Sequence, residues 1–534
     1  MSIQHTQVID CSDQKALHPT QVKSSSIDNH HCSGRLSRTL LASAVALALC
    51  GPGLVGSSQA ATISVSGGCS LVDAINSAND DDSISGCVDG AGADTIVLQN
   101  SSSHDYNSSN YNLYGFNALP FITSQITIEG NGATIRRTNG FTSGSTKFRL
   151  IHVDPNGNLT LNDTIISGGW ANGGNPNERN GGGILNRGQL SLDNCTLLNN
   201  SASSYGGGLA SRFGTASITN STVSSNGADS GGGGIYNGYG TLFITDSTLS
   251  GNGTGLFGAA FNARGGTSTF DNTLIANNES SQDGGAISSY LNGTIVNINN
   301  STLSSNQASN RGGAIRIGNN TTLNLNQSTV SGNSALQAGG AIFIEGIANV
   351  SNSTVSDNYS GTVGSGFGGG AIYNSNNLYL VNTTLSGNIS TGGVTASGLL
   401  NDGYAKLSNT ILANGVGGSD CVIVAATGSI SVDNHNIIQD NASCLGTAIS
   451  IDPLLGVLKN NGGTTQTHAL LAGSPAINAG DDAICNAVPV NNRDQRGRTR
   501  PSGLGCDIGA FEFDEDGFIV IPLPAQKVVV IPSG

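Results

Sequence analysis

The chain has 534 residues, of which 77 are glycine and only 21 are lysine or arginine. Aromatic residues make up 5% of the chain and charged residues 10%, and both fractions are low for a globular enzyme. The formal net charge of −14 leaves no basic footprint of the kind that binds nucleic acid, so a nucleic-acid partner is excluded. Glycine, serine, threonine and asparagine dominate, which favours short strands joined by tight turns.

Residues 1–60 have the pattern of an export leader. A basic edge precedes an apolar run from Leu40 to Leu49, and the tripeptide that ends at Ala60 resembles a small-residue cleavage site. A lipid anchor at Cys50 is an alternative, although leucine fits poorly just before a lipidated cysteine. No later stretch is long and apolar enough to span a bilayer as a helix. We therefore predict a protein that is exported to the medium or to the outer surface of the cell.

Residues 61–118 are predicted to cap one end of a repeated structure. After Cys69, apolar residues recur at helical spacing, namely Leu71, Ala74, Ile75 and Ala78. We expect this helix to cover the first repeat, because the open end of a stack of strands exposes unpaired backbone.

Residues 119–450 are predicted to contain the repeats. One phrase occurs nine times at spacings of 25–30 residues: Thr, then Leu, Val or Ile, then two variable residues, then Asn. The phrases begin at Thr196, Thr222, Thr248, Thr273, Thr302, Thr329, Thr354, Thr384 and Thr410. About halfway between them lies a glycine-rich mark, such as GGGL ending at Leu209 or GGAI ending at Ile315. A fixed period of this size indicates stacked units rather than one globular core.

Within one repeat, apolar pairs such as Leu323/Leu325 alternate with polar residues at the period of a strand. Three short strands per turn, stacked like on like, describe an all-β fold, the right-handed parallel β-helix. With roughly 4.8 Å between coils, about ten coils make a solenoid on the order of 50 Å long. At Thr273 and Thr410 the apolar pair lies one residue nearer to the Thr, which we interpret as a one-residue deletion in the turn.

The closing Asn of each phrase is predicted to form a ladder with a structural role. Each side-chain amide would bond to the equivalent Asn of the neighbouring coils and so satisfy a buried turn. The predicted ladder consists of Asn200, Asn226, Asn252, Asn277, Asn306, Asn333, Asn358, Asn388 and Asn414.

Seven of the ten cysteines lie after the predicted leader. In an oxidising compartment, cysteines close in sequence are expected to pair. The expected disulfides are Cys69–Cys87, Cys421–Cys444 and Cys485–Cys506. Cys195 is left over, and we interpret it as a small residue that fills a turn rather than as a reactive thiol. No metal-binding cysteine spacing is present, so no metal site is predicted from the cysteines.

Three segments resemble known families. The segment GCSLVDAINSAND, Gly68 to Asp80, resembles the CSLREA-type domain that begins exported β-helix proteins. The GGAI and T-[LV]-x-x-N repeats are similar to the GGA[ILV] and FxxN repeats of polymorphic outer membrane proteins. The segments LLAGSPAINAG (Leu470 to Gly480) and DQRGRTRPSGLGCDIGAFE (Asp494 to Glu512) resemble a choice-of-anchor Q domain. On this basis we assign residues 451–513 to a small C-terminal domain, followed by a β-prone tail at 514–534.

These resemblances imply a secreted or surface-displayed protein, in the outer membrane or released, of a kind regarded as adhesins. The first function that we consider is therefore a non-catalytic rod that binds polysaccharides or other cell-surface ligands. Four arginines are predicted to form a basic stripe that contacts carboxylates or sulfates. They are Arg187, Arg212 and Arg264, in equivalent positions of their coils, and Arg316 nearby. The competing interpretation is that these arginines are solvated and pair with local carboxylates.

The alternative function is a polysaccharide lyase or glycoside hydrolase built on a β-helix. Such chemistry needs two carboxylates, or a Ca²⁺ ion with a nearby base. Asp246 and Asp271 are the weak candidates, because they fall at matching turn positions of neighbouring coils. Other coils have Asn at this position, however, which indicates a turn residue. The acidic run Asp80-Asp81-Asp82 is the candidate site for a Ca²⁺ cofactor, although it lacks the Gly-Asp repeat spacing of calcium β-rolls. A purely structural spacer is a third interpretation.

Overall fold

The computed structural model describes residues 60–112, 115–138, 146–174, 176–361, 367–391, 394–424, 427–441, 443–444, 446 and 448–514. These residues belong to one compact unit. The predicted leader, apart from Ala60, and the tail after Asp514 lie outside the described residues. None of the described helices has the length and apolar character needed to cross a membrane.

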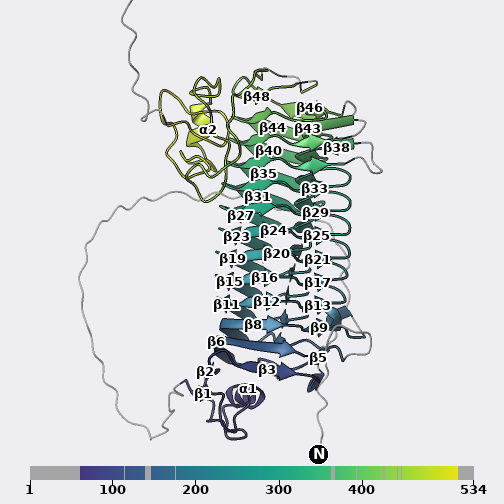
Figure 1. Ribbon diagram of the computed structural model, residues 1–534, viewed down its shortest axis with the longest axis vertical. Coiled ribbons are helices and arrows are strands. Elements are labelled where there is room, and N and C mark those ends of the chain that lie inside the picture. Colours follow the sequence, from purple (N-terminus) through teal and green to yellow (C-terminus); the bar gives the residue numbers. More distant parts are fainter. Residues whose placement is uncertain are drawn as a thin grey trace, which may run out of the picture. The chain divides into compact units, whose positions relative to one another are not determined.

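The described chain winds into a parallel β-solenoid of about 12 turns. Figure 1 shows its coils stacked one upon the next. A typical coil supplies two strands to a 25-stranded sheet (sheet 1), one strand to a 12-stranded sheet (sheet 2) and one to a nine-stranded sheet (sheet 3). Our expectation of about ten coils is slightly low. The complete phrase on which that count relied is missing from the coils of β6 (Gln125–Arg137) and β8 (Asn158–Ser167), and from the coil of β47 (Ser429–Ser431) and β48 (Ile437–Ile438) near the end.

Sheet 1 carries the Thr phrases. Its strands are β1 (Thr62–Ser64), β2 (Ala93–Val97), β3 (Ser103–Tyr106), β6 (Gln125–Arg137), β8 (Asn158–Ser167), β11 (Gln189–Asp193), β12 (Thr196–Leu198), β15 (Thr215–Thr219), β16 (Thr222–Ser224), β19 (Thr241–Thr245), β20 (Thr248–Ser250), β23 (Thr267–Asp271), β24 (Leu274–Ala276), β27 (Ile295–Asn299), β28 (Thr302–Ser304), β31 (Thr322–Asn326), β32 (Thr329–Ser331), β35 (Ile347–Ser351), β36 (Thr354–Ser356), β40 (Asn377–Val381), β41 (Thr384–Ser386), β44 (Tyr404–Ser408), β45 (Ile411–Ala413), β47 (Ser429–Ser431) and β48 (Ile437–Ile438).

Sheet 2 follows the glycine-rich marks. Its strands are β7 (Ile151–Val153), β10 (Ile184–Asn186), β14 (Leu209–Arg212), β18 (Ile235–Gly238), β22 (Phe261–Arg264), β26 (Ile287–Tyr290), β30 (Ile315–Ile317), β34 (Ile342–Ile344), β38 (Phe367–Gly369), β39 (Ile372–Asn374), β43 (Val394–Asn401) and β46 (Ser419–Ile423).

Sheet 3 consists of two-residue strands. They are β9 (Trp170–Ala171), β13 (Ser201–Ala202), β17 (Gly227–Ala228), β21 (Gly253–Thr254), β25 (Glu279–Ser280), β29 (Gln307–Ala308), β33 (Ser334–Ala335), β37 (Tyr359–Ser360) and β42 (Ile389–Ser390). A separate antiparallel pair is formed by β4 (Tyr111–Asn112) and β5 (Phe116–Asn117), and a 3-10 turn, η1, spans Pro176–Arg179.

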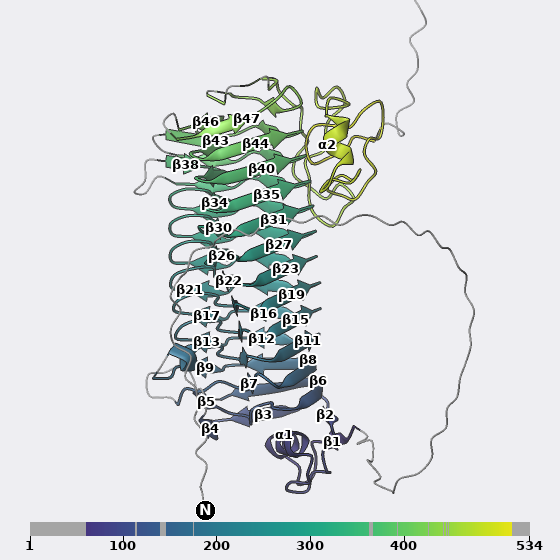
Figure 2. The same cartoon turned by 180° about the vertical axis from the view of Figure 1, so that it is seen from behind.

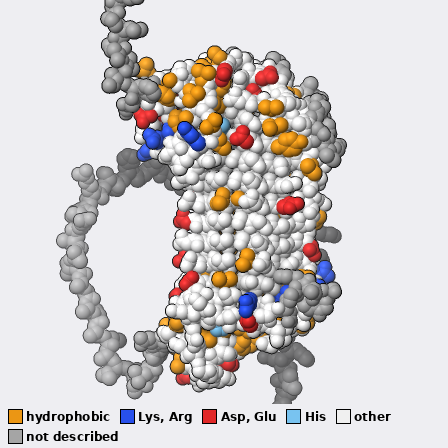
Figure 3. Space-filling view, viewed as in Figure 1, with side chains coloured by type: hydrophobic (Ala, Val, Ile, Leu, Met, Phe, Trp, Pro, Cys, Tyr) orange, Lys and Arg blue, Asp and Glu red, His pale blue; other side chains and the backbone are white. Residues whose placement is uncertain are grey.

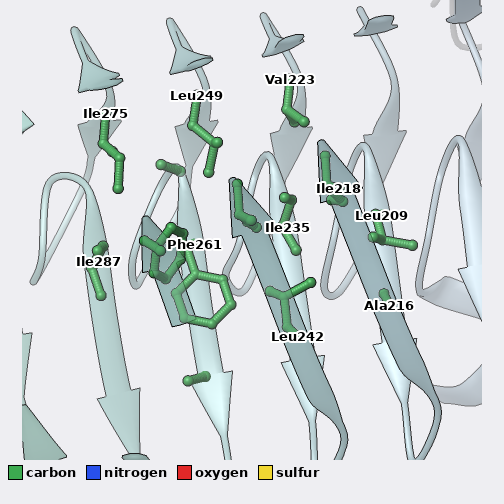
Figure 4. Close-up of a cluster of buried hydrophobic side chains, with 14 of the residues drawn as sticks. Leu209, Ala216, Ile218, Val223, Ile235, Leu242, Leu249, Phe261, Ile275 and Ile287 are labelled. Atoms are coloured by element: carbon green, nitrogen blue, oxygen red, sulfur yellow. The ribbon is translucent and has the colours of Figure 1, made fainter. Parts of the chain in front are cut away.

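The core consists of apolar rows that run along the solenoid. In sheet 2, Leu209 pairs with Ile235, Ile235 with Phe261, and Phe261 with Ile287. Figure 4 shows these side chains pointing inward, toward residues of sheet 1 such as Leu242. All five are fully buried. Strict alternation of inward apolar and outward polar residues in sheet 1 places every second residue in this core.

Glycines make the sharp turn into sheet 2 possible. Gly206 has a φ of +69°, a conformation that costs glycine nothing and disfavours other residues. At Gly207 a Cβ atom would lie 2.3 Å from the carbonyl oxygen of Gly227, so only glycine lets the two backbones approach this closely. The glycine-rich mark therefore reflects geometry rather than chemistry.

The asparagine ladder is present, with two corrections. Asn200, Asn226 and Asn252 each donate from the side-chain amide to the side-chain oxygen of the next ladder residue, at 3.0–3.1 Å. The same oxygen also accepts the backbone N–H of the preceding ladder residue. The ladder consists of Asn200, Asn226, Asn252, Asn278, Asn306, Asn333, Asn358 and Asn388, all buried.

Asn277 and Asn414 do not belong to this ladder, so both of these assignments were wrong. Sheet 1 pairs Thr248 with Leu274, and Thr384 with Ile411. In these two coils the Thr of the phrase therefore lies one position before the residue that pairs with the Thr of the neighbouring coil. No residue is deleted from the turn, so the interpretation as a deletion was wrong. Asn278 consequently takes the ladder position, while Asn277 and Asn414 are exposed turn residues with positive φ.

A second ladder, of hydroxyl groups, was not predicted. The backbone N–H of Ser301 donates to Ser328 Oγ at 3.1 Å, and the N–H of Ser328 donates to Ser353 Oγ at 3.1 Å. Thr273 belongs to this row, since its N–H donates to Ser301 Oγ. At its N-terminal end the row reaches Cys195, whose N–H donates to Ser221 Oγ at 2.9 Å.

Cys195 is therefore a buried member of the hydroxyl ladder, and we expect its thiol to be unreactive in the folded protein. Sγ lies 3.3 Å from the carbonyl oxygens of Leu161 and Asp193, and burial raises the pKa of the thiol to about 11. Because the thiolate is the reactive species, an alkylating reagent at neutral pH should label Cys195 only after denaturation. Peptide mapping by mass spectrometry checks this result, and rapid labelling of the native protein would contradict it.

Helix α1 (Leu71–Asp80) covers the N-terminal end of the core. Ser70 caps the helix by accepting the N–H of Asp73, and its buried face belongs to the same apolar cluster as the first coils. The Cys69–Cys87 disulfide closes the segment that contains the helix. In the acidic run, Asp81 is the C-cap residue and accepts the N–H of Gly92, so part of its charge already has a structural role.

The C-terminal segment, which holds helix α2 (Asp482–Asn486), packs beside the last coils in both Figure 1 and Figure 2. Gln495 forms the centre of the contact: it donates to Thr329 Oγ1 at 3.0 Å and accepts from Thr354 Oγ1 at 2.7 Å. The remaining two disulfides are Cys421–Cys444 and Cys485–Cys506, so all three expected pairs are present.

Candidate functional site

The register of sheet 2 lines up the predicted arginines of three coils. Arg212 pairs with Gly238, Gly238 pairs with Arg264, and Arg264 pairs with Tyr290. Arg187 directly follows Asn186, which pairs with Ser211, so Arg187 lies level with Arg212. We call Arg187, Arg212 and Arg264 the arginine row. At about 4.8 Å per coil, it extends for about 14 Å along the solenoid, and all three residues are partly exposed.

Arg316 lies outside the arginine row. Arg316 pairs with Ser288, which pairs with Asn262, which in turn pairs with Tyr236. The row of Arg316 therefore lies two residues before the arginine row along each strand. Its guanidinium contacts the carboxylate of Glu345 at 2.5 Å, and Arg311 binds Asp283 at 2.9 Å in the same network. The charge of Arg316 is therefore balanced within the protein. Its inclusion in a ligand-binding stripe is corrected accordingly.

Tyrosine rings adjoin the arginine row. Tyr236 is stacked on Tyr205, with 4.6 Å between ring centroids, and the hydroxyl of Tyr290 donates to that of Tyr205 at 3.4 Å. The guanidinium carbon of Arg264 lies 5.3 Å from the centroid of Tyr290, within cation–π range. These aromatics come from the otherwise variable positions of the repeat, so the repeat pattern did not reveal them.

Burial controls the electrostatics of this cluster. Burial of Tyr236 raises the pKa of its hydroxyl to about 12, although the positive charges of Arg212 and Arg264 oppose the rise. The pKa of Tyr290 is raised for the same reason, so both hydroxyls stay protonated at neutral pH. Among the described atoms, Arg264 Nε is a buried donor without a hydrogen-bond partner. The cluster is therefore positively charged.

Two exposed aromatic rings follow the arginine row at the next turn. Phe213 and Tyr239 occupy equivalent positions of successive coils, and their rings are nearly parallel, at 6°, with centroids 5.3 Å apart. Their φ angles are +61° and +60°. For residues with a Cβ this left-handed conformation costs about 1–2 kcal/mol each. The side chains nevertheless remain 65% and 52% exposed, so no core packing offsets this cost.

Asp246 and Asp271 do not form a catalytic pair. Sheet 1 pairs Asp271 with Thr245, so Asp246 is level with Asn272 instead. Asp246 Oδ1 accepts the side-chain amide of Asn272, and Asp271 Oδ1 accepts that of Asn300 at 2.9 Å. Both carboxylates thus belong to hydrogen-bonded rows of turn residues. The expectation that they occupy matching positions was wrong.

His468 has a serine partner that the sequence did not reveal. Its Nε2 lies 2.8 Å from Ser356 Oγ, and its Nδ1 lies 2.7 Å from the carbonyl oxygen of Gly456. Ser356 is fully buried, however, and burial also lowers the pKa of His468. A hollow of about 390 Å³ beside His468 is not lined by Ser356. The pair therefore joins the C-terminal segment to β36 and is closed to a substrate.

The described residues hold no group of three or more His, Cys, Asp or Glu side chains placed to bind a metal ion. On the face that Figure 3 shows, charged side chains are scattered, and hydrophobic side chains gather over the C-terminal coils. Cations also lie over aromatic rings elsewhere, as Lys147 does over Trp170 and Arg311 over Phe343, but the arginine row places three arginines in one register beside tyrosine rings.

Neither a family model nor a curated protein sequence matches the chain. Among solved structures, the crystal structure of pectate lyase Pel9A aligns over 79% of this chain and 88% of its own, with 15% identity and a TM-score of 0.31. At this identity and TM-score the alignment says nothing about activity. The resemblances to CSLREA-type and choice-of-anchor Q domains remain predictions, and the described chain is a parallel β-solenoid whose stacked coils form three parallel sheets.

Proposed function

We propose that this protein is an exported, non-catalytic binding protein whose arginine row holds an acidic polysaccharide. The observation that carries the proposal is the register that stacks three guanidinium groups along the solenoid beside tyrosine rings. A guanidinium group binds a carboxylate or sulfate through two parallel hydrogen bonds. Arg187 and Arg212 lie on adjacent coils and Arg264 lies two coils further on, with Gly238 between, so the row offers three sites for the acidic groups of one polymer chain.

The negative charge of the rest of the chain would direct an acidic polysaccharide to the arginine row. With a net charge of −14, most of the surface repels an anionic polymer, and the arginine row is a local exception. Export is supported by the three disulfides, which persist in oxidising compartments. Locating the protein in the medium, on washed cells or in the outer membrane fraction tests the export and its mode of attachment.

Binding to polysaccharides of known charge tests the function. We expect the protein to bind polygalacturonate, alginate or chondroitin sulfate in titration calorimetry, and not dextran or arabinan. The double variant R187A/R212A should lose at least about a hundredfold in affinity, because each charge-assisted hydrogen bond contributes about 1.5–3 kcal/mol. Binding should also weaken as salt rises.

The matched control removes two arginines elsewhere. Arg493 and Arg498 are exposed residues of the C-terminal segment, so R493A/R498A changes the net charge equally without touching the row. This control should retain wild-type affinity. If R187A/R212A bound as tightly as wild type, or if both variants lost affinity equally, the arginine row would not be the binding site.

The alternative of a lyase or hydrolase is not proposed, because the carboxylates of Asp246 and Asp271 accept the side-chain amides of Asn272 and Asn300 in rows of turn residues. The same polysaccharide incubations, with and without Ca²⁺, test it when the products are analysed for shortened chains. Cleavage by the wild-type protein would overturn the non-catalytic assignment.

A further inference from the structure

The exposed aromatic pair beside the arginine row has no structural role that its environment explains. The backbone joins the turn that holds Phe213 to the next coil, since the N–H of Phe213 donates to the carbonyl of Gly238 at 2.8 Å. In the next coil the N–H of Tyr239 donates to the carbonyl of Arg264 at 3.0 Å. Neither bond involves a side chain, so the turn geometry does not depend on the aromatic rings.

The repeat itself supplies a comparison. The next coil has Gly265 at the equivalent position, with a φ of +81°, which is the residue that this backbone conformation favours. Phe213 and Tyr239 instead adopt this conformation with large, exposed rings, and the partly buried Leu291 adopts it in the coil after Gly265, with a φ of +78°. Residues in such conformations gather at functional sites, and Phe213 and Tyr239 are set apart from Leu291 by exposed rings that stack on each other.

Gly265 also leaves room for the ring of Tyr239. A Cβ atom at Gly265 would lie 2.6 Å from Tyr239 Cδ1, so the ring extends over the glycine of the next coil. Phe213, Tyr239 and Gly265 thus form a short ridge along the solenoid, which we call the aromatic ridge. The guanidinium carbon of Arg212 lies 5.8 Å from the centroid of Phe213, so the ridge adjoins the arginine row directly.

We propose that the aromatic ridge is a sugar-binding platform, against which the C–H face of a pyranose ring packs while its acidic group binds the arginine row. This inference rests on the proposed function and deepens it, because it names the sugar face and the direction of the polymer. Both rows run along the solenoid axis, so the polysaccharide lies parallel to that axis. Burial of the two exposed rings on binding supplies apolar contact that the arginines lack.

The test replaces both ring residues by the amino acid that the turn favours. We expect F213G/Y239G to fold normally and to melt at or above the wild-type temperature, because glycine relieves the backbone strain. Affinity for the acidic polysaccharide that wild type binds should nevertheless fall at least tenfold. This loss should persist at high salt, whereas the loss in R187A/R212A should shrink as salt screens the arginines.

Tyr359 provides the matched control. Its side chain is 39% exposed, and it pairs with Ser334 in sheet 3, away from the ridge. The variant Y359S removes an exposed aromatic ring and should bind like wild type. If F213G/Y239G bound as tightly as Y359S, the ridge proposal would be wrong, while the arginine row would stand.

The remaining outcomes separate the two proposals. If wild type bound only neutral polysaccharides, and F213G/Y239G lost that binding, the ridge would stand and the acidic-ligand proposal would fail. If wild type bound no polysaccharide at all, both would fail. If sedimentation showed self-association that F213G/Y239G abolished, the ridge would be a contact between two copies of the chain, which overturns its role as a sugar platform.

Discussion

Replacing Asn278 by alanine is expected to lower the free energy of unfolding by about 3 kcal/mol or more. Asn278 Oδ1 accepts both the backbone N–H and the side-chain amide of Asn252, each at 3.0 Å. Its own amide donates to the carbonyl of Leu249 at 3.1 Å and to Asn306 Oδ1 at 2.9 Å. Alanine leaves several of these buried groups without a partner, and each unsatisfied group costs about 1–3 kcal/mol. Thermal and chemical denaturation measure the loss.

The neighbouring residue provides the control. Asn277 is exposed and has a φ of +56°, a conformation that glycine adopts without strain. The variant N277G should therefore change stability by a few tenths of a kcal/mol at most. A loss in N277G as large as that in N278A would mean that the ladder passes through Asn277, as the phrase alone suggested.

The second large effect is expected for Arg500 in the C-terminal segment. Arg500 is fully buried, with Nε 3.1 Å from Glu512 Oε2, and it donates from Nη1 to the carbonyl of Gly509 at 3.0 Å. Replacing it by methionine leaves the buried carboxylate of Glu512 without its counter-ion. Breaking such a pair costs about 3–5 kcal/mol. Limited proteolysis should cleave the C-terminal segment faster in R500M, and calorimetry should show its earlier melting.

The loss of stability that we expect in R500M should depend on pH. Burial raises the pKa of Glu512 to about 7, and the charge of Arg500 opposes this rise. Without Arg500 the pKa rises further, so the folded variant holds a proton that the unfolded chain has released. Stability then falls as pH rises above the ordinary pKa of a glutamate. The destabilisation should therefore be smaller at about pH 5 than at about pH 8.

An exposed arginine of the same segment serves as control for this pair. Arg498 has a side chain that is 48% exposed and lies 3.4 Å from Asp514. Ion pairs of this kind contribute at most about 1 kcal/mol. R498A should therefore resemble wild type at both pH values. If R500M were as stable as wild type, or if it lost the same stability at both pH values, the buried pair of Arg500 and Glu512 would not hold the C-terminal segment together.

The ladder and the arginine row show how far a repeat pattern predicts a site. The phrase occurs nine times and correctly gives seven of the eight ladder residues, because buried amides recur wherever the same turn recurs. It failed at Asn277 and Asn414, where the Thr lies one residue early. Phe213 and Tyr239 left no signal, because they fall where the repeat varies. His468 and Ser356 are 112 residues apart in the chain and meet only through folding.

The sequence by itself determined the parallel solenoid, the three disulfide pairs and the alignment of Arg187, Arg212 and Arg264. Alternating apolar residues, glycines at close turns and cysteines near each other act locally, so their pattern is readable along the chain. Only the tertiary structure decided which asparagine enters the ladder, that Asp246 and Asp271 lie in different rows, and that Glu345 binds Arg316. The reason is that hydrogen bonds between coils, rather than distance along the chain, set the row in which a side chain lies, and coil lengths of 25–30 residues shift that row unpredictably.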